Sequence, residues 1–338
     1  MATLKDVSKL AKVSPTTVSI VVNGNASKRR IPQETVDRVN AAVKELNYHP
    51  SVAARALRNA DLNKFTIGVY WTTGFRSSYL TRFMKGLQTW KEKSNMEVNI
   101  MICPFTVNEL YKEAALFQTD TYNAVIIATA SEGDLQYIHK HTINAPTVLT
   151  NRTSEIYNTV AVDSAEMGHL AAQHLIERGV KSAAIIALNN KNFVMSSSVR
   201  AFIAHCKIAG VSISDKHIIT TGYTFEEGYE AGRELIKRGE LPDAIFVDND
   251  SLAIGLLECL RKQRIDVPDD IQVISLGLGN PNYARYIHPS LTVVDVPLEL
   301  LAEEAMKLIE DIAEHRVDGV EHRYFNATLL PRATTKML

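Results

Sequence analysis

The fold of the N-terminal part is decided by residues 14–22, which read SPTTVSIVV. Ser14 is a good helix N-cap, and Pro15 suits the first helical position, where its missing N–H costs nothing. The stretch therefore predicts a helix that begins at Pro15 and runs to the end of this segment. In that helix Val18 and Val21 lie one turn apart on a single apolar face.

Another helix is expected on each side of this stretch. Thr3 and Asp6 fit a capping box before a segment with helical apolar spacing, and Pro32 begins a third helix with an apolar stripe that includes Val39. Two short helices joined by a tight turn, with a third that closes their core, describe a helix-turn-helix unit. Such a unit places its second helix in the DNA major groove.

The polar face of the second helix carries the residues expected to meet DNA. Thr16 and Thr17 lie opposite the valines and can bond phosphates or base edges. Ile20 lies on the same face, where an exposed β-branched residue indicates either a thymine-methyl contact or a site of lost specificity. Scattered apolar residues are also common on protein surfaces, so Ile20 can equally be an ordinary surface residue without a role in DNA binding.

Residues 51–58 form a short segment that carries Arg55 and Arg58 beside Leu57. A helix of this length is marginal alone in water. Two interpretations remain open at this point. The segment is either a plain linker or a helix that forms on DNA and inserts an apolar wedge into the minor groove.

Charge is distributed unevenly along the 338 residues. Residues 1–60 carry ten Lys or Arg and four Asp or Glu, a net charge of +6, whereas the remainder carries a net charge of −7. A basic head on an acidic body indicates that only the head meets a polyanion. A solvated surface with a chance asymmetry of charge explains this distribution equally well. The charges therefore agree with a DNA-binding headpiece but do not establish one by themselves.

After residue 61, short apolar runs such as Thr66–Trp71 and Ala183–Leu188 alternate with helical stretches. This alternation predicts parallel sheets covered by helices on both faces. The strands are too many for one small sheet, so we expect an α/β core of two similar parallel-sheet halves with a cleft between them. The expected domains are a headpiece (1–47), a hinge (48–60), a first core half (61–161 plus 293–320) and a second core half (162–292 plus 321–338).

Open parallel sheets bind ligands beyond the carboxyl ends of their strands, and this rule selects the residues that follow each strand. Aromatic faces together with Asn, Asp and Arg suit a polar ring ligand such as a sugar. For Asp163, which stands directly before a helix, helix capping is at least as good an explanation. The candidate effector-binding residues are Trp71, Phe75, Tyr79, Asn151, Arg152, Asp163, Phe193, Ser196, Arg200, Tyr223, Asn249 and Asn280.

An ordered set of spaced motifs stands near the N-terminus: Thr3-x-x-Asp6-Val7, Val13-Ser14-x-x-Thr17-Val18-Ser19, Val22-Asn23-Gly24, and Leu46-Asn47-Tyr48-x-Pro50 followed by Ala54-Arg55-x-Leu57. This set resembles the headpiece and hinge of the LacI/GalR family of bacterial transcription regulators. The resemblance continues through stretches such as Asn249-Asp250-x-x-Ala253-x-Gly255 and covers essentially the whole chain. It implies a helix-turn-helix headpiece with a hinge helix, followed by a core like that of a periplasmic sugar-binding protein.

The resemblance also implies how this chain meets DNA and its effector. The recognition helix reads the major groove, and the hinge helices of a homodimer pair in the minor groove with Leu57 as the wedge. By position, Tyr79, Ser196, Arg200 and Tyr223, together with Asn249, fall where family members contact effectors. The DNA-binding residues expected on these grounds are Thr3, Ser14, Pro15, Thr16, Thr17, Ser19, Ile20, Asn23, Arg29, Tyr48, Ser51, Ala54, Arg55 and Leu57.

The chain departs from the family pattern at three places. Ile20 stands where the family usually has an arginine that reads guanine, and Ser51 stands where asparagine is common. Gly279 replaces an aspartate that binds effector hydroxyls in the family, and Asn280 and Asn282 are candidates to take its place. The last departure leaves the identity of the effector open.

Sequence patterns of enzymes and metal sites are absent. The pair Gly277 and Gly279 lacks the third glycine of a dinucleotide site, and the histidines show no metal-ligand spacing. No Gly-x-Ser-x-Gly stretch or Walker loop occurs. We therefore expect no catalytic residues, no metal and no cofactor.

The sequence indicates a cytoplasmic protein that does not enter a membrane. Its three cysteines are far apart, the N-terminus lacks the apolar segment of a signal peptide, and no apolar run approaches the ~18 residues of a membrane helix. A secreted solute-binding protein, the distant alternative, fits the body but not the basic head.

These features together predict a DNA-binding transcriptional regulator, a repressor of a carbohydrate-utilisation operon. We expect a homodimer on double-stranded DNA, because a palindromic operator mirrors a two-fold axis. A small-molecule effector, by family habit a sugar, controls operator affinity from the cleft. The alternatives are a non-sugar ligand such as a nucleoside, or a phosphorylated partner protein.

Overall fold

The computed structural model describes residues 4–22, 26, 29, 31–46, 65–73, 77–118, 121–188 and 196–338. Several residues named from the sequence lie outside these ranges, so the structure says nothing of them: Thr3, Asn23, Tyr48, Ser51, Ala54, Arg55, Leu57, Phe75 and Phe193.

The predicted helix-turn-helix headpiece is confirmed. Its three helices are α1 (Leu4–Ala11), α2 (Pro15–Val22) and α3 (Gln33–Glu45). Val7, Val18 and Val39 come from different helices and are completely buried together. Ser14 caps α2 as expected, because its hydroxyl oxygen accepts a hydrogen bond of 3.1 Å from the backbone N–H of Thr17.

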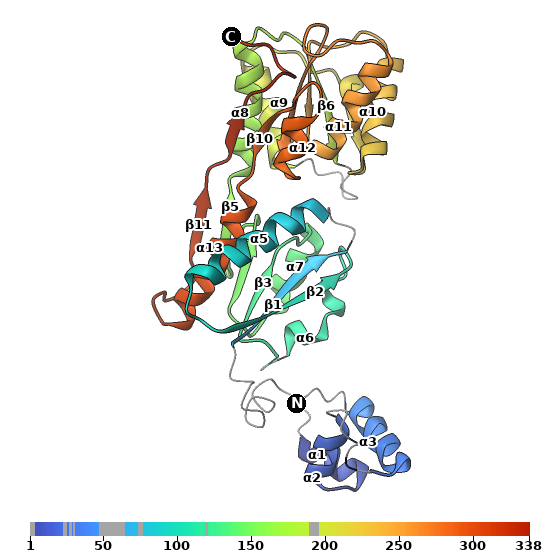
Figure 1. Ribbon diagram of the computed structural model, residues 1–338, viewed down its shortest axis with the longest axis vertical. Coiled ribbons are helices and arrows are strands. Elements are labelled where there is room, and N and C mark those ends of the chain that lie inside the picture. The colour runs from blue at the N-terminus through green and yellow to red at the C-terminus, as the bar shows by residue number, and fades with distance from the viewer. Residues whose placement is uncertain are drawn as a thin grey trace.

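The core contains two six-stranded sheets. Figure 1 shows that each half of the core holds one of them. The strand order is β11-β5-β4-β3-β1-β2 in the first sheet and β12-β10-β9-β8-β6-β7 in the second. All described neighbours are parallel except β10 and β12. The two orders correspond strand for strand, which confirms the prediction of two similar α/β halves.

The first sheet contains β1 (Phe65–Thr72), β2 (Val98–Phe105), β3 (Ala124–Ile127), β4 (Thr147–Thr150), β5 (Asn158–Val162) and β11 (His322–Phe325). The second contains β6 (Ala183–Leu188), β7 (Ile218–Thr221), β8 (Ala244–Val247), β9 (Gln272–Gly277), β10 (Thr292–Asp295) and β12 (Thr328–Leu330). The central strands are buried on both faces, as the continuous apolar runs predict.

Helices cover both sheets. The first half contains α5 (Ser77–Lys93), η1 (Leu110–Lys112), α6 (Ala114–Phe117), α7 (Glu132–Lys140) and α13 (Leu298–Ala313). The second half contains α8 (Ser164–Glu177), α9 (Ser197–Ile208), η2 (Asp215–His217), α10 (Phe225–Lys237), α11 (Asp250–Lys262) and α12 (Pro281–Tyr286). No described helix is long and apolar enough to cross a membrane.

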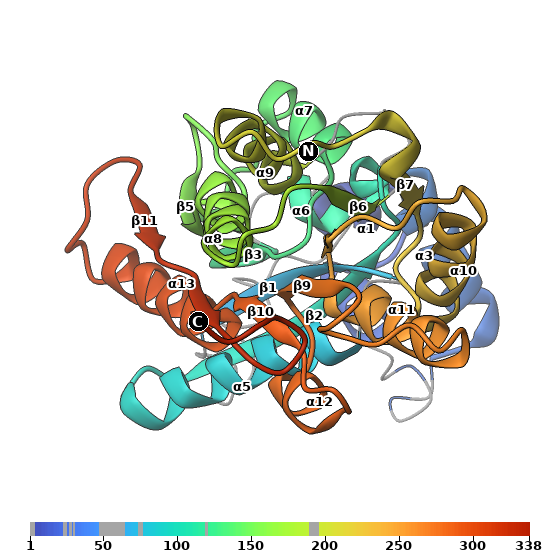
Figure 2. The ribbon, with the colours of Figure 1, turned by 90° about the horizontal axis from the view of Figure 1, so that it is seen from above.

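Helix α13 lies along α5, and both views of the ribbon show the two helices side by side (Figures 1 and 2). The approach is so close that a Cβ atom on Gly86 of α5 would overlap the carbonyl oxygen of Glu299. Farther along, the indole N–H of Trp90 donates a 2.8 Å hydrogen bond to the Glu310 carboxylate. These contacts join α13, which follows the second half in the sequence, to the first half.

The chain crosses between the halves later than the sequence predicts. Val293 was expected in the first half, but β10 pairs with β9 in the second sheet. Tyr324 was expected in the second half, but β11 pairs with β5 in the first sheet. Parallel pairing assigns β10 to the second sheet and β11 to the first. The chain therefore enters the first half only after Asp295 and leaves it only after Phe325.

Candidate functional site

The exposed side of α2 is the candidate DNA-binding surface. Ser14, Pro15 and Thr16 are exposed, and Thr17 and Ile20 are half-buried. The Thr17 hydroxyl lies 2.9 Å from the Ser14 hydroxyl, so the first turn of the helix carries a linked pair of hydroxyl groups. The exposed side of α2 therefore presents small polar groups and the apolar side chain of Ile20.

Two further headpiece residues named from the sequence have different surroundings. Arg29 is exposed in the loop before α3. Ser19 is only 8% exposed and lies in α2 between the buried Val18 and the half-buried Ile20. Ser19 thus offers less surface to DNA than Thr16 does.

A cleft of about 830 Å³ lies between the two halves. One wall is the face of α5 that carries Ser78, Thr81, Arg82 and Lys85, together with Glu299 at the start of α13. The other wall comes from the second half. Its lining residues are Tyr223, Thr224, Phe225, Asp250, Ser251, Ile254, Gly279, Asn280, Pro281, Asn282 and Tyr283.

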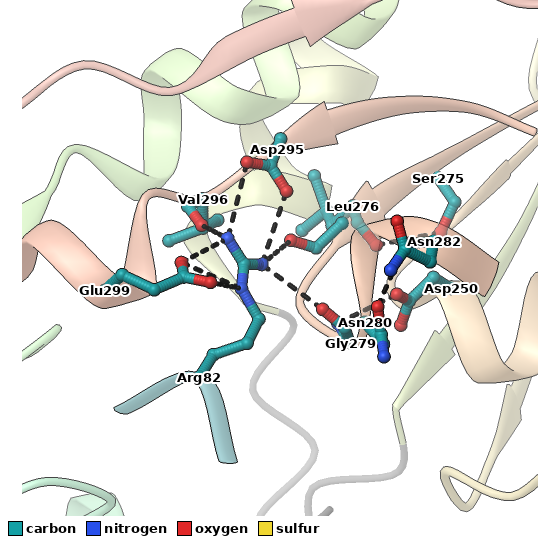
Figure 3. Close-up of polar contacts among 11 residues, drawn as sticks. Arg82, Asp250, Ser275, Leu276, Gly279, Asn280, Asn282, Asp295, Val296 and Glu299 are labelled. Carbon is teal, nitrogen blue, oxygen red and sulfur yellow. Dashed lines mark hydrogen bonds and ion pairs between the residues drawn. The ribbon is translucent and has the colours of Figure 1, made fainter. Parts of the chain in front are cut away.

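Arg82 joins the two halves at this cleft, as Figure 3 shows. Its Nε and Nη2 atoms donate hydrogen bonds of 2.7–3.0 Å to the Glu299 carboxylate. Its Nη1 atom donates to the carbonyl oxygens of Gly277 and Gly279, each at 3.3 Å, and its Nη2 atom donates to the Val296 carbonyl at 3.0 Å. One side chain of the first half is therefore bonded to the strand end and loop of the second.

Arg82 and its two carboxylate partners, Asp295 and Glu299, form a largely buried cluster of charges. Its Nη1 atom lies 3.3 Å from Asp295, and the Arg82 side chain is only 7% exposed. Burial alone would lower the pKa of this guanidinium, but the bonds to Glu299 and Asp295 outweigh burial and raise the pKa above its usual value. Burial raises the pKa of the Asp295 carboxyl even though Arg82 opposes that shift.

Asp250 fills the space beside Gly279. The backbone N–H of Gly279 donates a 2.8 Å hydrogen bond to the Asp250 carboxylate, which is part of a residue only 3% exposed. A Cβ atom on Gly279 would lie 2.5 Å from Asp250 Oδ2, closer than real contacts allow. No side chain can therefore replace the family aspartate at this position while Asp250 keeps its place.

Aromatic side chains line the second half's wall of the cleft. Tyr223, Phe225 and Tyr283 are 42%, 49% and 53% exposed. A capping box fixes the first two, because the Thr224 hydroxyl oxygen accepts from the Glu227 N–H and the Glu227 carboxylate accepts from the Thr224 N–H. These bonds lower the pKa of Glu227.

The residues predicted from the first half form an internally bonded group. Trp71 and Tyr79 are 4% and 5% exposed, and their ring centroids lie 5.2 Å apart. The Asn151 amide donates a 3.1 Å hydrogen bond to the Tyr79 hydroxyl. Arg152 donates to the carbonyls of Ala130 and Asn151, each at 2.6 Å, and burial lowers the pKa of its guanidinium. None of these four lines the cleft described above.

The residues predicted from the second half are mainly helix caps. Asp163 caps α8 and Ser196 caps α9, which agrees with the capping explanation offered for Asp163. Asn249 is completely buried and caps α11. Arg200 is exposed, and its Nη2 atom donates a 2.9 Å hydrogen bond to the Ser197 hydroxyl.

Of the predicted effector residues in the described part, Tyr223 and Asn280 line the cleft. Asn280 also caps α12, because its side-chain oxygen accepts a 3.0 Å hydrogen bond from the Asn282 N–H. Sequence reasoning missed four residues that line the cleft, namely Arg82, Lys85, Phe225 and Tyr283. Arg82 carried no local signal, because it lies beside the apolar stripe of α5 that includes Phe83, where a charged residue is typical of an exposed helix face.

Comparisons with known proteins agree with this architecture. Residues 3–51 match the family described as bacterial regulatory proteins, lacI family, and residues 172–335 match the periplasmic binding protein-like domain. The ribose operon repressor of Escherichia coli (strain K12) is 30% identical over 325 residues, which cover 94% of this chain and 93% of that protein. The HTH-type transcriptional repressor PurR of Pectobacterium carotovorum is 28% identical over 327 residues, with the same coverage of both chains.

A solved structure is similar as well. The crystal structure of a LacI family transcription regulator from Clostridium acetobutylicum is 32% identical, with a TM-score of 0.76, and the match covers 80% of this chain and all of that one. The confirmed headpiece, the two matching core halves and the similarity over 94% of the sequence point to one conclusion. This chain belongs to the lacI family of bacterial regulatory proteins and is a DNA-binding transcriptional regulator.

Proposed function

We propose that this chain is a repressor that binds a palindromic operator as a homodimer and is controlled by an uncharged carbohydrate in its cleft. One observation carries the choice of ligand, namely the charge balance of the lining residues. The cations Arg82 and Lys85 are matched by the carboxylates of Asp250 and Glu299. An anionic ligand finds no excess of positive charge there, whereas a sugar can use the aromatic faces and polar atoms.

One relative supports a carbohydrate effector for this chain. The protein with 30% identity over nearly the whole length is named for the ribose operon, and its chain is covered to 93%. A nucleoside is also uncharged and has a ring that aromatic residues can stack on, so it is the main competing ligand in the test below.

The proposed DNA contacts follow the exposed side of the headpiece and the hinge. Thr16 and Ile20 of α2 are proposed to face bases, and Thr17 a phosphate. The other proposed contacts are Ser14, Pro15, Ser19 and Arg29 in the described part of the chain, and Thr3, Asn23, Tyr48, Ser51, Ala54, Arg55 and Leu57 outside it.

The proposed effector contacts begin with the residues at the cleft. Tyr223 and Asn280 line it, and Asn249 stands directly before the lining residue Asp250. The Nδ2 atom of Asn249 has no hydrogen-bond partner among the described residues, so a donor is available to a ligand oxygen. The remaining proposed contacts are Trp71, Phe75, Tyr79, Asn151, Arg152, Asp163, Phe193, Ser196 and Arg200.

Arg82 is proposed to carry the response from the cleft to the first half. It lines the cleft, and it bonds the carbonyls of Gly277 and Gly279 in the second half. A ligand that moves the 277–279 loop must therefore change the bonds of α5, and such a change shifts how the halves sit relative to each other.

A thermal-shift screen of the purified full chain tests the effector class. The arms are pentoses, hexoses, disaccharides, nucleosides and sugar phosphates. We expect an uncharged saccharide to raise the melting temperature, because ligand at 100 times Kd adds about 2.7 kcal/mol of stability. A shift with nucleosides or sugar phosphates, and none with saccharides, would contradict the proposal.

Operator selection with the native chain and an Ile20→Arg variant tests the DNA-binding surface. We expect the native chain to select thymine where the arginine variant selects guanine, with about 1–3 kcal/mol of discrimination at that base pair. Selection of guanine by both proteins would show that Ile20 does not read this position.

A further inference from the structure

The side chains that line the cleft fall into a buried inner group and an exposed outer group. Asp250 and Arg82 define the inner end, and they are 3% and 7% exposed. Phe225 and Tyr283 define the outer end, and they are 49% and 53% exposed. A ligand at the inner end alone would leave both outer rings in contact with water.

The outer rings lie on one wall. Exposed apolar residues are normally scattered singly over a surface, but here Phe225, Tyr283 and the neighbouring Tyr223 line a single cavity. Apolar groups gathered beside a binding site mark surface that a ligand covers. A sugar ring can lay the C–H groups of one face on an aromatic ring while its hydroxyl groups point outward.

The facing wall supplies polar groups for those hydroxyls. Ser78, Thr81 and Lys85 lie at intervals of three and four residues on α5, so they share one face of the helix. Thr81 and Lys85 are exposed. A ring held between the walls would therefore meet an aromatic surface on one side, and hydroxyl and ammonium groups on the other.

Helix caps hold the backbone that carries the aromatic wall. The capping box of Thr224 and Glu227 holds the start of α10, with hydrogen bonds of 3.0 and 3.2 Å. The Asn280 side chain and Pro281 fix the start of α12, which carries Tyr283. Because this backbone is already ordered, binding has a lower entropic cost than it would if a loop had to be ordered.

The cleft has room for more than one ring. Its volume of about 830 Å³ is in the upper part of the ~300–1,000 Å³ range of small-molecule sites. We propose that the outer end, between Thr81 and Lys85 on one wall and Phe225 and Tyr283 on the other, is a subsite for the second ring of a disaccharide. This inference rests on the proposed carbohydrate response and adds the size of the ligand to it.

Calorimetric titration of the full chain with disaccharides and their component sugars tests the subsite. The probes are cellobiose, maltose, lactose and sucrose, compared with glucose, galactose, fructose and ribose. We expect one disaccharide to bind at least tenfold more tightly than either of its component sugars, because the second ring adds both a stacking contact and hydrogen bonds, and tenfold corresponds to about 1.4 kcal/mol.

Alanine variants test which aromatic residues of the cleft bind the second ring. Phe225→Ala and Tyr283→Ala should each weaken that disaccharide about tenfold and its tighter-binding component sugar by much less, whereas Tyr223→Ala should weaken both. Tyr286→Ala is the matched control, because Tyr286 is on the same helix as Tyr283, is 75% exposed and does not line the cleft. Melting curves of each variant confirm that it folds.

The outcomes separate the two proposals. Tightest binding of ribose or another monosaccharide would overturn the subsite and leave the carbohydrate response in place. Equal losses for the disaccharide and the monosaccharide in Phe225→Ala and Tyr283→Ala, or a loss in Tyr286→Ala, would also overturn the subsite. Failure of every saccharide to bind would overturn both proposals.

Discussion

The two walls of the cleft use their side chains in opposite ways. On α5, the guanidinium of Arg82 is bonded to Glu299, Asp295 and backbone carbonyls, and its side chain is 7% exposed. On the facing wall, Phe225 and Tyr283 leave about half of their surface to water. Arg82 therefore bonds the two halves of the protein to each other, whereas Phe225 and Tyr283 have surface available for a ligand.

This difference separates the residues that hold the halves together from those that a ligand can use. A side chain whose polar atoms already have partners gains little from a ligand, and its removal costs stability. A side chain with exposed apolar surface gains when that surface is covered. Substitutions on the two walls should therefore change different measurements, with stability on the Arg82 side and affinity on the aromatic side.

The largest effect on stability is expected for Arg82→Met. The change leaves Asp295 and Glu299 without their cation in a partly buried setting. We expect a loss of about 2–3 kcal/mol, less than for a fully buried pair, because both carboxylates keep some contact with water. Urea unfolding of the purified chain at neutral pH measures the change.

Lys85→Met is the matched control for that measurement. Lys85 lies one turn farther along α5, lines the same cleft and is exposed. Its substitution should change the free energy of unfolding by less than about 0.5 kcal/mol. Equal midpoints for both variants would show that the bonds of Arg82 do not stabilise the protein.

The fold was largely predictable from the sequence. Short apolar runs such as Ala183–Leu188 and Ala244–Val247, set between helical stretches, favour buried parallel strands. The cap at Ser14 and the valine spacing of α2 predicted the headpiece for an equally local reason. The crossovers were misplaced, because strand pairing, and not the apolar pattern, assigns β10 and β11 to their sheets.

The site was less predictable, because the strand-end rule selects residues near the carboxyl edge without showing which way they face. Tyr223 and Asn280 line the cleft, but Tyr79 and Asn151 bond each other. Phe225 lies at the start of α10, one step beyond the strand-end loop, and Arg82 lies on a helix. Their roles depend on how the two halves meet, and no local pattern contains that information.

The loop between the walls gives the next test, Gly279→Ala. The added Cβ would lie 2.5 Å from Asp250 Oδ2, so either the loop or the carboxylate must move. We expect a loss of about 2 kcal/mol in the free energy of unfolding, typical of overpacking. In an Asp250→Ser background, where the shorter side chain leaves room, the same change should cost less, and a double-mutant cycle gives the coupling. Additive losses would show that the two residues do not compete for this space.

The smallest effect compares the hydroxyl of Tyr79, which is bonded inside the first half, with the hydroxyl of Tyr223 on the aromatic wall. Tyr79→Phe removes the oxygen that accepts the 3.1 Å hydrogen bond from the Asn151 amide, in a ring only 5% exposed. We expect a loss of about 1 kcal/mol in the free energy of unfolding, because the amide loses a partner in a largely buried place. Urea unfolding measures this change.

Tyr223→Phe is the matched substitution on the aromatic wall. Its ring is 42% exposed, so loss of the hydroxyl should change stability by less than about 0.5 kcal/mol. The ring that stacks on a sugar is retained, so any change in saccharide affinity reports the hydroxyl alone. If Tyr223→Phe destabilises the chain as much as Tyr79→Phe, the aromatic wall is part of the internal bonding of the protein, and the contrast between the two walls fails.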